Sequence, residues 1–379
     1  RYLATPSETD HLDFAISTDC YDKSNYYTRF NLDLLDYRNM QHILRGLYTH
    51  EFEDYLTITM GGDGMYDYLK SYQFSHSDDH HDQWTADFFA QADWTINTHW
   101  NIIAGIREDY FSHYGWEFSP KVAAMYKVEN IRLRGSYSKG FRAPSLKEMY
   151  MDFNMANIFN IYGNDQLESE RTNSLSLSAE YFLSDYCFTL TGYYNIIDNE
   201  ITTTWDPTLS DGRGAMKYRN IDGTNLASID ASVMARYDCG LNWKVCYSFF
   251  HEFAADGLNT NDARPHSLTA QVDWVKNWKN YQLNVVLNGR LLSKATYYNI
   301  TNNNGSYDKY ELYTSEGYTM WKLSINQRFW DGLMLSLCVD NLLDYKPKRY
   351  EYNTPYTIGR SYNIGLTADI DRLAKTIKK

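Results

Sequence analysis

The feature that most constrains this chain is an alternation of apolar and polar residues with a period of two, repeated in long segments along the sequence. In one segment, Tyr362, Ile364 and Leu366 fall on one face, and Asn363 and Thr367 fall on the other. The same alternation recurs in residues 131–138, 174–181, 282–291 and 321–329. Segments of about nine to eleven residues have the length that a tilted strand needs to cross a bilayer. The pattern therefore predicts membrane-spanning strands.

A soluble sandwich with one wet face is the alternative interpretation of any single segment. Repetition over about sixteen segments favours a membrane barrel, because a sandwich of this size would have shorter strands and more turn residues. The chain has only 7 Pro in 379 residues. We predict an all-β fold, a transmembrane antiparallel β-barrel over residues 1–370, followed by a periplasmic tail at 371–379.

The links between the predicted strands alternate in length. Short links are expected at 97–98, 128–130, 184–186 and 331–332. Long polar excursions are expected near 74–84, 140–171, 202–216, 254–264 and 293–317. Short turns on one side and long loops on the other are typical of outer-membrane barrels, whose long loops face the outside of the cell.

Composition excludes several classes of protein. The formal charge of −12, from 36 Lys+Arg and 48 Asp+Glu, argues against a nucleic-acid partner. The 5 cysteines lack the spacing of a zinc site or a disulfide framework. No window approaches the roughly 18 apolar residues of a membrane-spanning helix. No nucleophile triad or phosphate-binding loop stands out, so we expect no enzyme activity and no intrinsic cofactor.

Three boxes of residues, in this order, carry a resemblance to a known family. The first is Phe141, Arg142, Ala143 and Pro144. The second contains Asn164, Leu167 and Glu170. The third is Asn341-Leu342-Leu343-Asp344, near the end of the chain. Together they resemble the C-terminal barrel of a TonB-dependent outer-membrane receptor, in which the first two boxes flank an extracellular loop.

The resemblance implies a barrel of about 22 strands filled by an N-terminal plug, of which this sequence contains about sixteen strands and no plug-like segment. It implies coupling to TonB–ExbB–ExbD through a TonB box on that plug, with outer-membrane lipid and a surface lipoprotein as further partners. The plug and the remaining strands are expected from another chain or from another part of the polypeptide.

The implied function is TonB-driven import of a scarce iron complex, either haem or a ferric siderophore, across the bacterial outer membrane. Cobalamin import is the alternative, because haem receptors of this group carry a histidine between the first two boxes and residues 145–162 contain none. A passive pore and an adhesin barrel are rivals from other classes. Asp165 stands where the family has proline, and Ile370 where it has a terminal aromatic residue.

Methionine and aromatic side chains crowd the segment between the boxes, and they suit flat or greasy ligands. The candidate substrate contacts there are Met149, Tyr150, Met151, Phe153, Met155, Phe159 and Tyr162. Tyr297 and Tyr298 are further candidates on another external loop. The alternative interpretation is that these residues pack the loop against its neighbours.

One predicted loop is rich in histidine and carboxylate. Its candidate cation ligands are His76, Asp78, Asp79, His80 and His81. Imidazole and carboxylate groups together bind cations, so this loop could hold a metal ion or sit over haem iron. A polar loop facing water is the simpler explanation of the same residues.

Overall fold

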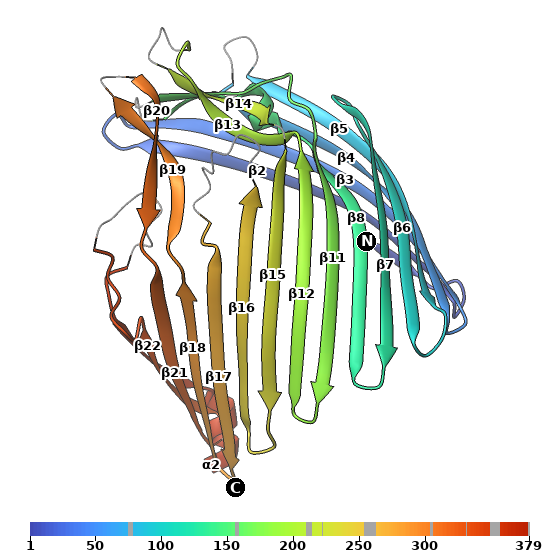
Figure 1. Cartoon of the computed structure of the whole chain (residues 1–379), viewed down its shortest axis with the longest axis vertical. Coiled ribbons are helices and arrows are strands. Elements are labelled where there is room, and N and C mark those ends of the chain that lie inside the picture. The colour runs from blue at the N-terminus through green and yellow to red at the C-terminus, as the bar shows by residue number, and fades with distance from the viewer. Residues whose placement is uncertain are drawn as a thin grey trace.

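The computed structural model is one curved, single-layer antiparallel sheet with smaller elements gathered at one end (Figure 1). It describes residues 1–377 apart from 75–78, 156–158, 210–213, 222, 254–262, 304–305, 331 and 349–356. The main sheet has 17 strands, each paired with its neighbour along the chain. This architecture confirms the predicted all-β fold.

The strands of the main sheet follow one another in space as in sequence, with β8 beside β11, β12 beside β15 and β18 beside β21. They are β1 (Tyr2–Ala4), β2 (Asp10–Tyr27), β3 (Leu32–Phe52), β4 (Leu56–Ser71), β5 (His80–Thr95), β6 (Trp100–Phe111), β7 (Gly115–Val128), β8 (Ile131–Arg142), β11 (Glu170–Leu183), β12 (Tyr186–Asp198), β15 (Thr224–Arg236), β16 (Leu241–Phe253), β17 (His266–Trp278), β18 (Tyr281–Leu292), β21 (Tyr318–Phe329), β22 (Leu333–Asp340) and β23 (Ser361–Ala368).

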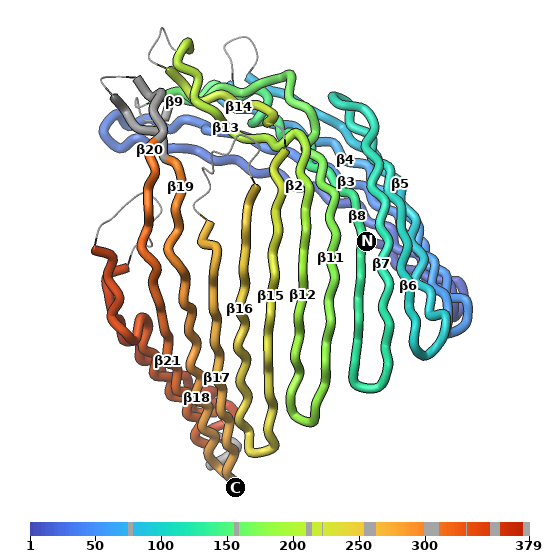
Figure 2. The backbone as a smooth tube through the Cα atoms, viewed as in Figure 1, coloured from blue at the N-terminus to red at the C-terminus, as the bar shows by residue number. Residues whose placement is uncertain are grey.

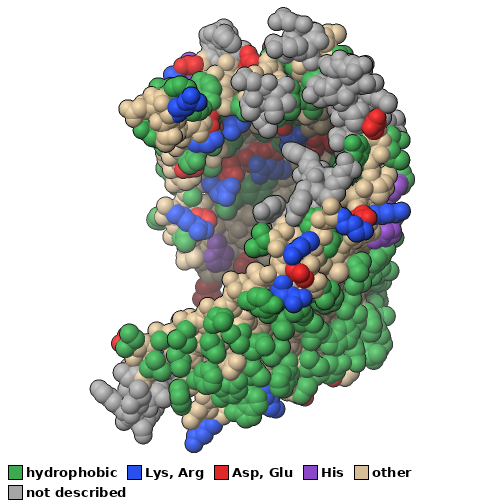
Figure 3. All heavy atoms as spheres, turned by 90° about the vertical axis from the view of Figure 1, so that its left-hand side faces the viewer, with side chains coloured by type: hydrophobic (Ala, Val, Ile, Leu, Met, Phe, Trp, Pro, Cys, Tyr) green, Lys and Arg blue, Asp and Glu red, His purple; other side chains and the backbone are tan. Residues whose placement is uncertain are grey.

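Successive side chains of each strand point to opposite faces of this sheet. The outer face carries exposed apolar residues such as Ile106, Leu177 and Leu190. The concave inner face carries charged residues, which are visible inside the hollow in Figure 3. Because the described residues form no second layer over the apolar face of this sheet, membrane lipid is the medium that can cover it.

Aromatic residues mark two levels on the outer face. Trp94 and Trp100 lie next to the short turn that joins β5 and β6. Trp84, Tyr110 and Trp116 lie at the opposite ends of β5, β6 and β7. Two aromatic rows that bound an apolar band are typical of a barrel in a bilayer.

The described parts of the long links lie on one side of the sheet, as predicted, whereas 254–262 of the expected link 254–264 lie outside the described residues. They contain α1 (Leu146–Tyr150), β9 (Asp152–Met155), β10 (Phe159–Tyr162), β13 (Glu200–Asp206), β14 (Ala215–Ile221), β19 (Ala295–Asn303) and β20 (Ser306–Ser315). The predicted asymmetry needs one correction, because the links 28–31 and 112–114 on this side are short. The strands before and after 28–31 are the longest of the sheet, with 18 and 21 residues, so that they themselves extend outward.

The two edges of the sheet do not pair with each other in the part of the chain described. β23 pairs with β22, and at the other edge β1 and β2 pair together. Figure 2 shows the blue strands β2 and β3 passing behind the yellow-green ones, so the sheet curves through much of a turn. After β23 the chain forms α2 (Ile370–Ile377), beginning one residue before the predicted tail. Among the described residues, no helix is long and apolar enough to span a membrane.

Candidate functional site

Arg142 joins four segments of the outer rim. It lies at the end of β8, and its guanidinium donates hydrogen bonds to Glu148 Oε1 at 2.8 Å and Glu170 Oε2 at 3.1 Å. It also donates to the backbone oxygen of Ile201 at 3.1 Å. Charge-assisted bonds of this kind are stronger than neutral ones. The arginine of the first box therefore connects β8 to α1, β11 and β13.

The short helix α1 begins with a complete capping box. Ser145 Oγ accepts a hydrogen bond from the backbone N–H of Glu148, and Glu148 Oε2 accepts one from the backbone N–H of Ser145 at 2.8 Å. Such reciprocal bonds satisfy donors that the first turn of a helix leaves free. Pro144 is fully buried before the cap, and its oxygen accepts a hydrogen bond from the Tyr114 hydroxyl at 2.6 Å.

The second box folds back on α1. Asn164 N–H donates to the oxygen of Glu148 at 3.0 Å, and Leu167 is buried. A Cβ on Gly163 would lie 2.5 Å from the oxygen of Met149, so only glycine permits this approach. We call residues 142–149 and 163–170 the clasp.

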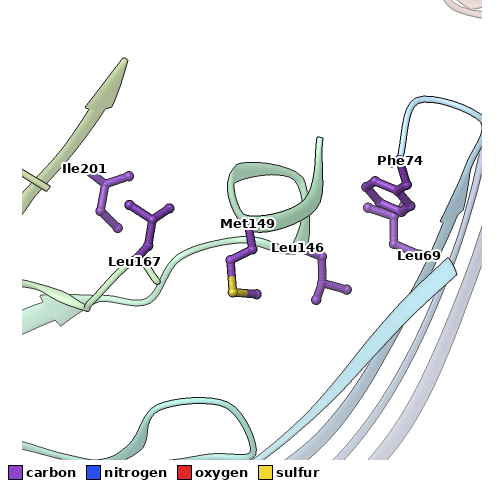
Figure 4. Close-up of a cluster of buried hydrophobic side chains, with 6 residues drawn as sticks. All are labelled: Leu69, Phe74, Leu146, Met149, Leu167 and Ile201. Atoms are coloured by element: carbon purple, nitrogen blue, oxygen red, sulfur yellow. The ribbon is translucent and has the colours of Figure 1, made fainter. Parts of the chain in front are cut away.

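The buried core of the described chain lies at the clasp rather than within the sheet. Figure 4 shows its six apolar side chains, which come from β4, the β4–β5 link, α1, the second box and β13. They are Leu69, Phe74, Leu146, Met149, Leu167 and Ile201. Burial of these side chains fixes the clasp to the barrel rim through the hydrophobic effect.

The candidate substrate residues between the boxes divide into two groups. Met149 is buried in the core, whereas Tyr150 stacks on His81 with ring centroids 3.6 Å apart. Met151 forms an isolated bridge with Phe74. The others lie on the hairpin of β9 and β10, namely Phe153, Met155, Phe159 and Tyr162. This hairpin joins β14 and β13 in a four-stranded sheet that we call the lid sheet.

Tyr297 and Tyr298 lie elsewhere, on the separate hairpin of β19 and β20. Tyr297 is buried, and its ring centroid is 6.5 Å from that of Tyr313. This hairpin lies at the upper left of Figure 1 and forms a two-stranded sheet separate from the lid sheet. The structure therefore does not bring these tyrosines together with the residues between the boxes.

The candidate cation ligands do not share one described site. His76 and Asp78 lie outside the described residues. Asp79 accepts a hydrogen bond from Lys70 Nζ, and this bond lowers the pKa of the Asp79 carboxyl, with a smaller contribution from His80. Consecutive strand residues point to opposite faces, so His80 lies against Tyr68 while His81 lies against Tyr150. In the portion of the chain described, no group of three such side chains could hold a metal ion, and the cation site stays a prediction.

A polar cavity of about 430 Å³ lies beneath the clasp. Its walls include His113, Tyr150, Asp165 and the ion pair of Glu117 with Arg171. In this pair, Arg171 Nε donates to Glu117 Oε2 at 3.0 Å and Arg171 Nη2 donates to Glu117 Oε1 at 2.8 Å. Burial raises the pKa of the nearby Tyr114 phenol, which therefore stays neutral and keeps its hydrogen bond. This cavity can accept polar groups.

A larger hollow of about 860 Å³ lies on the inner wall, on strands β16, β17, β18, β21 and β22. Lys244, Arg290 and Lys322 supply positive charge, and Asp340 is the acidic residue on its lining. Lys322 Nζ lies 2.9 Å from Asp340 Oδ1. The excess of cations can attract an anionic group that enters the lumen. We call this the wall hollow.

Sequence reasoning missed most of these partners. No local motif marks Tyr114, Glu117 or Arg171. They reach the clasp because β6 ends, and β7 and β11 begin, at the same rim. The lysines of the wall hollow stand at the polar positions of the alternation in their strands, and this pattern predicts that they face the lumen. Parity assigns a face but not a depth along the strand.

Comparisons with known proteins agree with this architecture. A family model described as TonB dependent receptor-like, beta-barrel, matches residues 2–342. The iron-regulated outer membrane virulence protein of Vibrio cholerae is 25% identical over 305 residues, covering 75% of this chain and 44% of that protein. The vitamin B12 transporter BtuB of Vibrio cholerae is 25% identical over 349 residues, covering 88% and 49%.

Solved structures show the same fold. The siderophore receptor PirA from Acinetobacter baumannii has a TM-score of 0.72 at 15% identity, covering 95% of this chain and 59% of that one. A mutant of the ferric enterobactin receptor PfeA from Pseudomonas aeruginosa has a TM-score of 0.72 at 16% identity with the same coverage. The chain thus spans about half the length of the curated relatives it matches.

Proposed function

The chain belongs to the TonB-dependent receptor-like β-barrel family, and from that premise we propose that it takes part in active import of a ferric siderophore or haem. This family is located in the bacterial outer membrane. The observation that carries the proposal is the barrel wall together with the clasp and the lid sheet, which lie at one end of that wall (Figure 1).

The charges of the lumen support an anionic cargo. The wall hollow contains Lys244, Arg290 and Lys322 against Asp340. Ferric siderophores and haem commonly carry carboxylate or phenolate oxygens, which such cations attract. The names of relatives, an iron-regulated outer membrane protein and siderophore receptors, point to the same class of cargo.

We assign contacts with the cargo to half-buried residues of α1 and the lid sheet. Their aromatic and thioether groups suit a flat ligand. They are Tyr150 at the end of α1, Met151 after it, and Phe153, Phe159 and Tyr162 on the lid sheet. We assign Met149 a packing role because it is buried in the clasp.

Partners are part of the proposal. Both edges of the described sheet have unpaired strands, which are costly in a bilayer, so further strands are needed to close the barrel. A plug inside the closed barrel would couple transport to TonB–ExbB–ExbD. The charged inner face supports such a plug, because a hydrated polar wall can bind a folded polar domain.

Cobalamin import is the second candidate. The BtuB relative is matched over 88% of this chain, and residues 145–162 lack the histidine expected of haem receptors. Cobalamin import would use the same barrel and the same energy source.

Uptake in a strain that lacks the chromosomal gene and carries the full receptor on a plasmid tests the proposal. Radiolabelled ferric siderophore, haem and cobalamin are offered separately, with and without a protonophore. We expect saturable, protonophore-sensitive uptake of an iron complex. Changing Lys244 and Lys322 to glutamine should slow it, whereas Lys276→Gln should not, because Lys276 lies on the outer face of the neighbouring strand β17.

Each other outcome has a definite meaning. Energised uptake of cobalamin alone would replace the first proposal by the second. Protonophore-insensitive passage of all three compounds would favour a passive pore. Absence of uptake with normal amounts of receptor in the membrane would refute import and favour an adhesin.

A further inference from the structure

The polar cavity of about 430 Å³ beneath the clasp, which we call the clasp cavity, carries more acid than base. Its charged lining residues are Glu117, Asp165, Glu168 and Arg171. Glu117 and Arg171 form an ion pair in which the Glu117 side chain is only 5% exposed, so these two charges cancel. Asp165 and Glu168 are exposed, and neither has an ion-pair partner in the described part of the chain. The clasp cavity therefore attracts a positive charge.

A buried hydroxyl group without a partner lies in the wall of the clasp cavity. Ser169 lines the cavity and is 2% exposed, and its Oγ has no hydrogen-bond partner among the described residues. A buried polar atom without a partner costs free energy, and most such atoms in folded proteins are satisfied. Because a hydroxyl oxygen accepts hydrogen bonds, a bound group that carries N–H donors would satisfy Ser169.

Two further side chains of the lining offer lone pairs. His113 Nε2 donates a hydrogen bond to the backbone oxygen of Asp82 at 2.9 Å, so Nδ1 of the neutral imidazole keeps its lone pair. Burial raises the pKa of the Tyr150 phenol, and the charge of Asp165 raises it further, so the Tyr150 hydroxyl stays neutral. The clasp cavity thus brings several hydrogen-bond acceptors to a negatively charged space.

The apolar part of the lining favours an organic cation over a metal ion. Met149 and Leu167, two members of the buried core in Figure 4, line the clasp cavity. Apolar side chains beside carboxylates suit an alkyl chain that ends in a positive charge. No group of three His, Cys, Asp or Glu side chains in the described residues could hold a metal ion.

The clasp cavity is built into the barrel wall at a place where β7 and β8 separate. The two strands pair with each other only as far as Lys121 and Ser138. Beyond this point, residues 115–120 of β7 pair with β6, and residues 139–142 of β8 pair with β11. The ion pair at the cavity joins β7 to β11 across this separation. Paired strands therefore hold the clasp cavity open on both sides.

We propose that the clasp cavity binds a primary alkylammonium group of the cargo, so that the imported iron complex bears an amine. The ammonium group pairs with the carboxylates of Asp165 and Glu168 and donates to Ser169 Oγ, while the adjoining methylene groups contact Met149 and Leu167. This inference rests on the proposed import of an iron complex. It distinguishes between the candidate cargoes, because neither haem nor cobalamin carries an alkylammonium group. A cargo with charges of both signs can use the wall hollow as well.

Saturation-transfer NMR on the full receptor in detergent micelles tests the site itself. The probes are 4-amino-1-butanol and 1,4-butanediol, which have the same length and differ by one ammonium group. We expect saturable binding of the amine and none of the diol. The double variant Asp165→Asn, Glu168→Gln should weaken amine binding about tenfold, because each exposed ion pair contributes a few-fold. Ser169→Ala should weaken it about fivefold through the loss of one hydrogen bond.

Asp238→Asn is the matched control for the loss of carboxylate charge. Asp238 is exposed and lies in the short turn between β15 and β16, at the other end of the sheet. This variant should bind the amine as the unchanged receptor does, and the heat-dependent gel shift of a folded barrel checks the folding of every variant. Equal binding of amine and diol, or unchanged amine binding by the double variant, would overturn the inference.

Uptake by whole cells separates this inference from the proposed function. Excess 4-amino-1-butanol should raise the KM for uptake of the iron complex about threefold without changing the maximal rate, and 1,4-butanediol should have no effect. Uptake that is insensitive to the amine would overturn the assignment to the cargo but leave import intact, and it would favour a lysine of the plug as the occupant. Absence of any uptake would refute the proposed import, whereas the NMR titration would still decide whether the clasp cavity takes an ammonium group.

Discussion

Replacing Arg142 with methionine should loosen the clasp without unfolding the barrel. The change removes bonds to Glu148 and Glu170, whose side chains are only 17% exposed. Hydrogen bonds to charged groups contribute about 1.5–3 kcal/mol each to stability when they are shielded from water. The Arg142 side chain is 43% exposed, so solvent weakens its bonds to both glutamates. We expect a loss of about 2 kcal/mol, which is roughly a thirtyfold rise in the opening equilibrium. Hydrogen exchange of the Met149 and Asn164 amides, which are bonded in the clasp, measures this rise.

Arg134→Met is the control for this experiment. Arg134 pairs with Glu180 at 2.9 Å and is 40% exposed, so the lost ion pair is comparable but lies on β8 away from the clasp. Exchange of residues 145–170 should stay at the level of the unchanged receptor. If Arg142→Met changed exchange there by less than threefold, or if Arg134→Met raised it equally, the clasp would not depend on Arg142.

Three further changes test the surroundings of the clasp. Gly163→Ala places a Cβ against the backbone of Met149, and limited proteolysis should show faster cleavage within 145–170. Tyr114→Phe removes a hydrogen bond to the backbone before α1 and should cost the clasp about 1 kcal/mol, read by the same exchange assay. The bond from Lys70 lowers the pKa of Asp79, so its stabilising effect is complete above the ordinary carboxyl pKa and is lost as pH falls through the lowered value. The Ser71 amide donates a hydrogen bond to the backbone oxygen of Asp79, so its hydrogen exchange should become faster in acid. Asp79→Asn should remove this pH dependence.

The fold was predictable because period-two alternation acts locally. Each strand of the sheet has one face toward lipid and the other toward the lumen. The type of a residue such as Leu366 or Thr367 therefore predicts its face without reference to the other strands. Most link lengths were predictable for the same reason, but the long link 341–360 between β22 and β23 was not predicted. The short outer turns at 28–31 and 112–114 were not, because strand length beyond the membrane leaves no separate signal in alternation.

The candidate site was predictable only in part. Arg142 and Glu170 were identified from a motif, yet their common partner Ile201 lies far along the chain and carries no motif. Met149 illustrates the limit: the segment around it is rich in methionine and aromatic residues, and composition alone does not separate a buried side chain from an exposed one. Residues from several strands must meet before that distinction exists.

The clasp core also orders events in time. Its members span residues from Leu69 to Ile201, so the core cannot form until β4, β8, β11 and β13 have reached their places. Bringing together segments so distant in sequence carries a large loop-closure cost, which makes this a late step of folding. During biogenesis, residues 145–170 should therefore become protected from protease only after the strands that carry the clasp core have assembled.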